Sequence, residues 1–366
     1  MVVVVHGRMT RRFLPPLVAF LLQRAVLAAV AWAYNYDPLA PSSWVRWDSG
    51  YYVSIAIHGY QPLTHCPPES HYPPTTWCGN AGWFPGYSWL LAWTPKGVSP
   101  ETAAILLSAI AQLGCLLLVW RLLNDDRQWP ALGIAAFFPG NVYMAAVFPI
   151  SLFLVSALTC LTCSLSGKFV LAALAGAFAA TCYPTGLLLA PVVFLWALIH
   201  RRWRALSVPA GVVIGYAAVL WQLHRQAGTW DAFFRVQGKY EHTGNMLDTL
   251  GARLKPLVNA RYRNAKGLVT ALQTLLSTAL VGILGYKGGR SLSSERTSLL
   301  LLYVVTFWMA PLIVGGNVSL YRSEALLLPA VILLPTLPRW LQFVLLVAAV
   351  LLSVPMAALF FRGILV

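Results

Sequence analysis

The feature that most constrains this chain is its succession of apolar runs, many of them long enough to cross a lipid bilayer. A helix needs roughly 20 apolar residues to span the hydrocarbon core. Hydrophobic residues make up 58% of the 366 residues and charged residues only 10%, with a mean hydropathy of +0.68. A soluble globular domain does not have this composition. The sequence therefore predicts an all-α polytopic membrane protein.

Apolar runs between polar breaks predict about eleven transmembrane helices. We expect one transmembrane domain over residues 1–366, with a first external loop at 36–100 and a second at 224–266. The expected spans are 13–34, 102–121, 130–147, 150–165, 168–182, 185–199, 205–223, 267–286, 297–314, 323–337 and 340–360. The first of them reads as a retained helix and not as a signal peptide, because no small-residue cleavage site follows it.

Lys and Arg in short loops predict the orientation, since such residues concentrate on the cytoplasmic side. The N-terminus is expected in the cytoplasm because it carries Arg8, Arg11 and Arg12. The basic segments "HRRWR" at 200–204 and "KGGRSLSSER" at 287–296 are expected on the same side. The basic loop 224–266 contradicts this rule, so either it is basic for a functional reason or the helix count is wrong by one. The net charge of +15 fits topology and anionic lipid or substrate headgroups better than nucleic acid. Short loops favour a prokaryotic plasma membrane over an endoplasmic reticulum.

An acidic residue stands out in "WVRWDSGYYVSIAIHGY", residues 44–60, because only 11 residues of the chain are acidic. Asp48, followed by Ser49 and Gly50, is a good N-cap for a helix over about 49–58 that ends at Gly59. A capped interfacial helix is thus one interpretation. A second aromatic segment, "WFPGYSWLLAW" at 83–93, is too short to span and also reads as an interfacial helix.

The stretches "RWDSGYYVSIAIHGY" and "GWFPGYSWLL" resemble the first external loop of the GT-C membrane glycosyltransferases. They resemble most the branch with the second mannosyltransferase of the GPI-anchor pathway and its prokaryotic relatives. The resemblance implies a GT-C-like bundle with interfacial helices in the first external loop. It also implies an inverting transfer of mannose from a polyprenyl-phosphate donor to a glycan or lipid-linked acceptor at the external face. In that family the motif Asp, here Asp48, is the general base.

Weaker similarities extend along the chain. The segments that resemble the family are 137–158, 179–191, 231–242 with Gln237, and 321–335 with Arg322. Two positions depart from it: Ile150 stands where many relatives have Glu, and Tyr183 stands where many have Arg. These departures leave open a divergent or inactive member.

The remaining residues still provide the chemistry of such a transfer. A lipid phosphate is a weak base, so its departure requires cations and no strong general acid. Arg322, Arg235 and Arg46 are the candidate cations. Alternatively, Arg46 pairs with Asp48 or reaches lipid phosphates, and Arg322 anchors a helix end.

Other candidates for substrate binding surround these groups. Trp47, Tyr52 and Tyr60 fit either an interfacial aromatic belt or sugar stacking. His58 fits an interfacial hydrogen bond or a second base. Gln237 is a candidate only through the resemblance.

The segment "HCPPESHYPPTTWC" has two interpretations. His65, Cys66, Glu69, His71 and Cys78 could hold a metal, or Cys66 and Cys78 could form a disulfide across the proline-rich loop. A single aspartate without a second acid argues against metal-dependent transfer, so we expect no cofactor.

A transporter or flippase for a lipid-linked or anionic solute is the alternative from another class. Such a protein should carry ionisable residues or broken helices at mid-membrane depth, and only Arg24, Pro139 and Pro149 favour this. A scaffold that kept the fold without catalysis is a third possibility. The expected partners are the bilayer, the donor and the acceptor, with no nucleic acid and no predicted oligomeric state.

Overall fold

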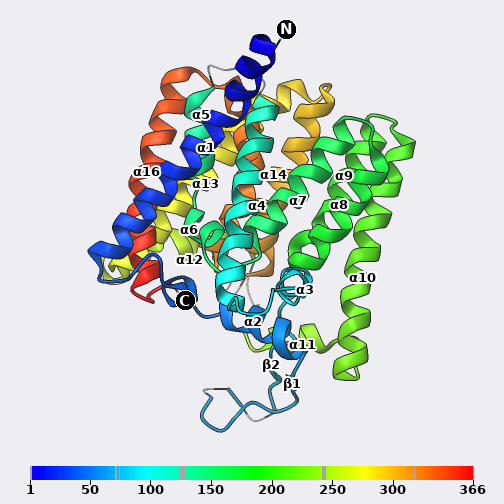
Figure 1. Ribbon diagram of the computed structural model, residues 1–366, viewed down its shortest axis with the longest axis vertical. Coiled ribbons are helices and arrows are strands. Elements are labelled where there is room, and N and C mark those ends of the chain that lie inside the picture. The colour runs from blue at the N-terminus through cyan, green and yellow to red at the C-terminus, as the bar shows by residue number, and fades with distance from the viewer. Residues whose placement is uncertain are drawn as a thin grey trace.

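A computed structural model describes residues 2–70, 72–73, 75–123, 128–240, 245–315 and 319–365, with side chains described from residue 13 onward. The described part is a helical bundle with one short pair of strands (Figure 1). Six of its helices are long and apolar enough to cross a membrane, which supports an integral multi-pass membrane protein. They are α1 (Val2–Ala33), α4 (Pro100–Leu123), α10 (Ser207–Ala227), α13 (Ala265–Gly288), α14 (Glu295–Val314) and α16 (Arg339–Phe361).

Three shorter apolar helices complete the apolar bundle: α7 (Ile150–Leu165), α8 (Phe169–Cys182) and α9 (Leu189–Ile199), the last preceded by the 3₁₀ turn η2 (Pro184–Leu188). Small residues let α8 and α10 approach closely, since a Cβ on Gly215 would lie 2.2 Å from the Ala177 carbonyl oxygen. Large apolar side chains such as Leu174, Ile214 and Leu351 are exposed on the outside of the bundle, as expected for a surface that contacts lipid.

Two of the predicted spans are broken inside, and those over 185–199 and 205–223 begin in 3₁₀ turns. The expected helix over 130–147 is broken into α5 (Trp129–Ala136) and α6 (Asn141–Ala145), because Pro139 lacks an N–H and Gly140 has φ +78°. The span over 323–337 consists of the end of α15 (Leu320–Ser323) and the 3₁₀ segment η6 (Glu324–Thr336), which contains two prolines. The predicted count of about eleven membrane helices therefore remains unconfirmed.

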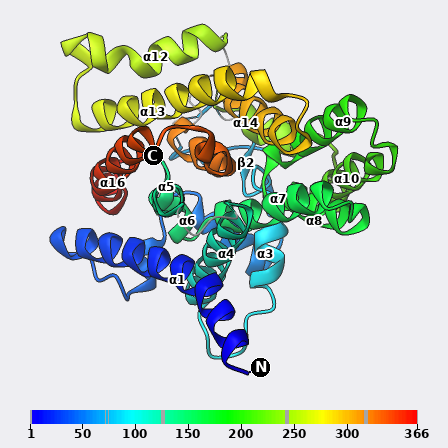
Figure 2. The ribbon, with the colours of Figure 1, turned by 90° about the horizontal axis from the view of Figure 1, so that it is seen from above.

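The two loops predicted to be long gather at one end of the bundle, away from the N-terminus (Figure 1). We call this the loop end. The first loop, residues 36–100, contributes η1 (Pro41–Trp44), α2 (Ser49–His58), the paired strands β1 (Pro62–Leu63) and β2 (Cys78–Gly79), and α3 (Gly86–Leu91). The second loop, residues 224–266, contributes α11 (Ala232–Gly238), α12 (Met246–Val258) and η4 (Ala260–Tyr262). Helix α12 packs along α13 on the outside of the bundle (Figure 2). Two further turns, η3 (Trp203–Leu206) and η5 (Gly289–Ser291), lie before α10 and α14.

The predicted helix over 49–58 is confirmed as α2. It ends at Gly59, which has φ +71° and donates its N–H to the Ile55 carbonyl. Helix α3 covers the expected interfacial segment over 83–93 and packs against the bundle on one side. Phe84 before it and Tyr87 within it are fully buried, and the Tyr87 hydroxyl donates to the Ala104 carbonyl at 2.8 Å. Helices α2 and α3 of the first loop are thus held against α4.

Candidate functional site

The carboxylate of Asp48 forms an ion pair with Arg322, 274 residues away in α15. Asp48 lies at the N-cap position of α2 but makes no capping hydrogen bond, so the predicted capping role of its side chain is wrong. Arg322 donates from Nη1 to Asp48 Oδ2 and from Nη2 to Ser319 Oγ at 2.9 Å. The side chains of Asp48 and Arg322 are 22% and 20% exposed, respectively. The fold therefore joins the proposed base and one proposed cation at a partly accessible position.

Aromatic side chains from several elements surround this pair. Arg322 lies over the ring of Phe148, 5.7 Å from its centroid, and Tyr52 meets the same ring edge-on at 6.4 Å. Tyr143 of α6 lies 5.2 Å from Phe148. Burial raises the pKa of the Tyr52 phenol, and the Asp48 charge adds to this effect. The aromatic side chains around the pair are therefore neutral at physiological pH, and Asp48 and Arg322 carry the charge.

Burial alone would lower the pKa of Arg322, but the adjacent Asp48 carboxylate raises it, and the pKa stands above its ordinary value. Arg322 is therefore a permanent cation. Tyr183, one of the two positions that depart from the resembling family, has a pKa raised by burial and influenced by both Arg322 and Asp48. It thus lies near the pair. Ile150, the other such position, is fully buried at the start of α7.

Arg46 and Trp47 adjoin Asp48 in sequence, but their side chains make other contacts. The Arg46 guanidinium donates to the Phe361 carbonyl at the end of α16 at 3.0 Å, and to the carbonyls of Ser42 and Val45. Trp47 has φ +43° and meets Phe360 edge-on at 6.3 Å. The structure therefore does not bring the Arg46 guanidinium to Asp48. These contacts fasten the segment before α2 to α16.

Two other candidates tie the loop segments together. Tyr60 is buried, and its hydroxyl donates to the Trp83 carbonyl at 2.9 Å. Gln237 of α11 donates from Nε2 to the Gly82 carbonyl at 2.7 Å. His58 is exposed in the last turn of α2. Tyr60 and Gln237 thus hold the segment before α3 against α2 and α11.

Lys239, which follows α11, belongs to the same region and was missed by the sequence reasoning. Its ammonium lies 5.6 Å from the ring centroid of Trp83, 5.4 Å from that of Tyr72 and 4.9 Å from that of Tyr240. Burial lowers the pKa of Lys239, and the Asp48 charge partly opposes this. Its only signal in the sequence is its position two residues after Gln237.

The predicted cysteine pair is joined in the structure, where Cys66 and Cys78 form a disulfide beside the β1–β2 pair. Trp77 precedes Cys78, and the Arg235 guanidinium lies over its ring at 4.9 Å while donating from Nε to Asp231 at 2.8 Å. His71 lies outside the described residues. Within the described residues, no group of three or more His, Cys, Asp or Glu side chains could hold a metal ion.

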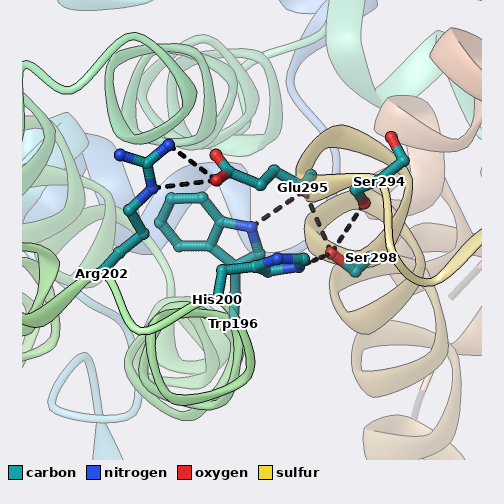
Figure 3. Close-up of polar contacts among 6 residues, drawn as sticks. All are labelled: Trp196, His200, Arg202, Ser294, Glu295 and Ser298. Atoms are coloured by element: carbon teal, nitrogen blue, oxygen red, sulfur yellow. Dashed lines mark hydrogen bonds and ion pairs between the residues drawn. The ribbon is translucent and has the colours of Figure 1, made fainter.

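A second polar cluster lies where α9 and η3 meet the start of α14, near the N-terminal end of the bundle (Figure 3). Arg202 donates from Nε and Nη2 to one oxygen of Glu295, at 2.9 and 2.7 Å. Trp196 donates its indole N–H to the Glu295 carbonyl at 2.9 Å, and His200 bonds to Ser298 at 2.6 Å. These bonds join two neighbouring helix ends, and we call them the α9–α14 cluster.

No protein-family model matches this sequence, and no curated protein matches it.

Proposed function

We propose that this protein is a glycosyltransferase that moves a sugar, mannose by the resemblance of its first loop, from a polyprenyl phosphate to a glycan or lipid-linked acceptor. The observation that supports this best is the Asp48 carboxylate, which Arg322 holds in a partly accessible, aromatic-walled position at the loop end. A scarce acid fixed by a permanent cation fits a general base beside an anionic substrate.

In the proposed reaction, Asp48 accepts the proton of the acceptor hydroxyl. The acceptor oxygen forms a bond to the anomeric carbon while the bond from that carbon to the phosphate oxygen breaks. The bonding electrons leave with the polyprenyl phosphate, and the configuration at the anomeric carbon inverts. Asp48 then returns its proton to water.

Arg322 has two effects in this proposal. It fixes the orientation of the Asp48 carboxylate by the ion pair. The positive charge of its guanidinium also stabilises the negative charge that develops on the leaving phosphate. Ser319 holds the second guanidinium nitrogen at 2.9 Å, so the cation is oriented before substrate binds. A general acid is unnecessary because a phosphate is a good leaving group.

The test is transfer from radiolabelled polyprenyl-phosphate mannose by purified protein, comparing wild type with Asp48→Asn. We expect about a 10²- to 10⁴-fold loss, the contribution typical of general-base catalysis. Glu295→Gln is the matched control, because Glu295 also pairs with an arginine but lies in the α9–α14 cluster at the other end of the bundle. Full activity of Asp48→Asn would refute the base assignment. Transfer from no lipid-phosphate sugar at all would refute the proposed function.

We also propose that the loop end faces the outside of a prokaryotic plasma membrane, as the distribution of Lys and Arg suggests. Thr75 and Lys287 are exposed at the loop end and just before η5, respectively. A membrane-impermeant thiol reagent added to intact cells should label Thr75→Cys and leave Lys287→Cys unlabelled. The reverse pattern would contradict this orientation.

Transport or flipping of an anionic or lipid-linked solute is the second candidate, and buried polar groups in α1 favour it. Gln23 is fully buried and its amide has no hydrogen-bond partner within the described residues, while Arg24 donates to the Ala145 carbonyl at 3.3 Å. Polar side chains inside a membrane are costly and often mark a solute path. Counterflow of a labelled polyprenyl-phosphate sugar in proteoliposomes, abolished by Arg24→Leu but not by Asp48→Asn, would support transport over transfer.

A further inference from the structure

An open pocket of about 370 Å³ lies at the loop end, between the disulfide-bonded loop and α11. Its lining combines hydroxyl groups, one indole ring and two cations. The residues are Thr75, Thr76, Trp77, Arg235, Gly238 and Lys239. This volume accommodates one or two sugar rings, and the lining offers both polar and aromatic contacts for them.

The pocket carries net positive charge. Arg235 donates its Nε to Asp231, and this single carboxylate offsets one of the two cations. Lys239 forms no ion pair within the described residues and lies instead among the rings of Tyr72, Trp83 and Tyr240. Rings hold the ammonium in place without neutralising it. An anionic group entering the pocket would therefore meet a partly desolvated cation that has no ion-pair partner among the described residues.

Trp77 supplies the aromatic surface. One face of its ring is covered by the Arg235 guanidinium at 4.9 Å, and the side chain remains partly exposed at the pocket. An indole face packs well against the C–H face of a sugar ring, and threonine hydroxyls bind its hydroxyl groups. Cys78, next in sequence, is fixed by both the disulfide and β2, so Trp77 is held in place before any ligand binds.

A chain of contacts connects the pocket to Asp48. Lys239 lies 5.6 Å from the ring centroid of Trp83, and the Trp83 ring stacks on Tyr51 at 3.8 Å in the helix that Asp48 precedes. We propose that this pocket binds a saccharide that carries a carboxylate or phosphate, as the part of the acceptor beyond the reacting hydroxyl. This assignment to the acceptor rests on the proposed function, whereas binding of an anionic saccharide by the pocket can be measured without it.

The experiment is saturation-transfer NMR and calorimetric titration of the purified full-length protein. The probes are glucuronate, mannose 6-phosphate, mannose and inorganic phosphate. We expect the two anionic sugars to bind at least tenfold more tightly than mannose or phosphate. Trp77→Ala and Lys239→Gln should each weaken them about tenfold, as for loss of a stacked ring or a charge-assisted contact.

Matched controls are present on the same loop. Trp93 is 86% exposed and Lys96 is exposed, and neither lines the pocket, so Trp93→Ala and Lys96→Gln should leave binding unchanged. The thermal unfolding midpoint of each variant checks its fold. Replacement of both Cys66 and Cys78 by Ser should also weaken binding, because Trp77 loses its anchor.

Three results would overturn the inference. Equal affinity for mannose and glucuronate would show that the pocket does not require an anion. If phosphate binds as tightly as mannose 6-phosphate and Trp77→Ala does not weaken it, the pocket does not recognise the sugar. Equal effects of the control and pocket substitutions would show that binding occurs elsewhere. Anionic-sugar binding by a wild-type protein that transfers sugar from no lipid phosphate would refute the proposed function and keep this pocket.

Discussion

Two of the ion pairs among the described residues lie at opposite ends of the bundle, Asp48–Arg322 at the loop end and Arg202–Glu295 in the α9–α14 cluster, and their surroundings differ. Asp48 and Arg322 are 22% and 20% exposed, whereas Arg202 and Glu295 in the α9–α14 cluster are 53% and 34% exposed. Asp48 and Arg322 join segments 274 residues apart, while Arg202 and Glu295 are 93 residues apart.

The surroundings differ in what they allow each pair to do. At the α9–α14 cluster the charged side chains are more exposed, and Trp196 bonds to the Glu295 backbone carbonyl while His200 bonds to Ser298 (Figure 3). Such a pair adds little to stability and joins two helix ends. At the loop end, two charges are removed from most of their water and placed beside aromatic rings. Removing charges from water is costly, so a pair of this kind fits a functional role better than a purely stabilising one.

Removing one partner of the buried pair should have the largest effect on stability. Arg322→Gln leaves the Asp48 carboxylate without its cation, so we expect the free energy of unfolding to fall by about 3 kcal/mol. Denaturant unfolding in detergent micelles measures this. Arg322→Lys keeps the charge and should lose less, although it loses the planar contact to Ser319. A loss no larger than that of Arg202→Gln would show that the two pairs are equivalent.

The sequence predicted the parts of the site better than their connections. The limits of α2 and its end at Gly59 follow from local patterns that the structure retains. Asp48 and Arg322, both named through the resemblance, form an ion pair. The capping role of Asp48 was wrong because capping is local, while its partner comes from α15. The breaks in the predicted spans follow from prolines, which an apolar count ignores.

Other parts of the site required the three-dimensional structure. Arg46 is adjacent to Asp48 in sequence, but its guanidinium reaches the end of α16, 315 residues away. Lys239 joins the site only because Gln237 bonds to Gly82 and so brings α11 against the first loop. Pairings between distant segments of this kind leave no periodic signal in a single sequence.

A second prediction concerns pH and Lys239. Burial among the rings lowers the pKa of this lysine, although the charge of Asp48 partly opposes the shift. Among the described residues, the other ionisable groups in this region are Tyr51, Tyr72, Tyr240 and Arg235. Lys239 is protonated below its pKa, so affinity for glucuronate should fall as pH rises through that lowered value. The fall should occur at a lower pH than the one at which an ordinary lysine loses its proton.

We expect about a tenfold loss of glucuronate affinity across this transition, the effect of one charge-assisted contact. Lys239→Arg should abolish the decline, because a guanidinium keeps its proton throughout the range. Titration calorimetry at several alkaline pH values, with mannose as the neutral ligand, gives the comparison. An identical decline in Lys239→Arg would assign the titration to another group.

The exposed pair should give the smallest effect. Arg202→Gln removes two hydrogen bonds to Glu295, yet the two side chains are 53% and 34% exposed. We expect the free energy of unfolding to fall by less than about 1 kcal/mol. Transfer activity should stay at the wild-type level, since the α9–α14 cluster lies at the opposite end of the bundle from α2 (Figure 1). A larger loss in either measurement would give this cluster a role beyond joining helix ends.

The most direct test of the central claim compares the rates of mannosyl transfer of Asp48→Asn and Glu295→Gln, at equal amounts of folded protein. Each substitution replaces the acid of one ion pair by its amide. We expect at least about a 100-fold loss for Asp48→Asn, as for removal of a general base, and a nearly unchanged rate for Glu295→Gln. Similar rates for the two variants would contradict the role of Asp48 as the base.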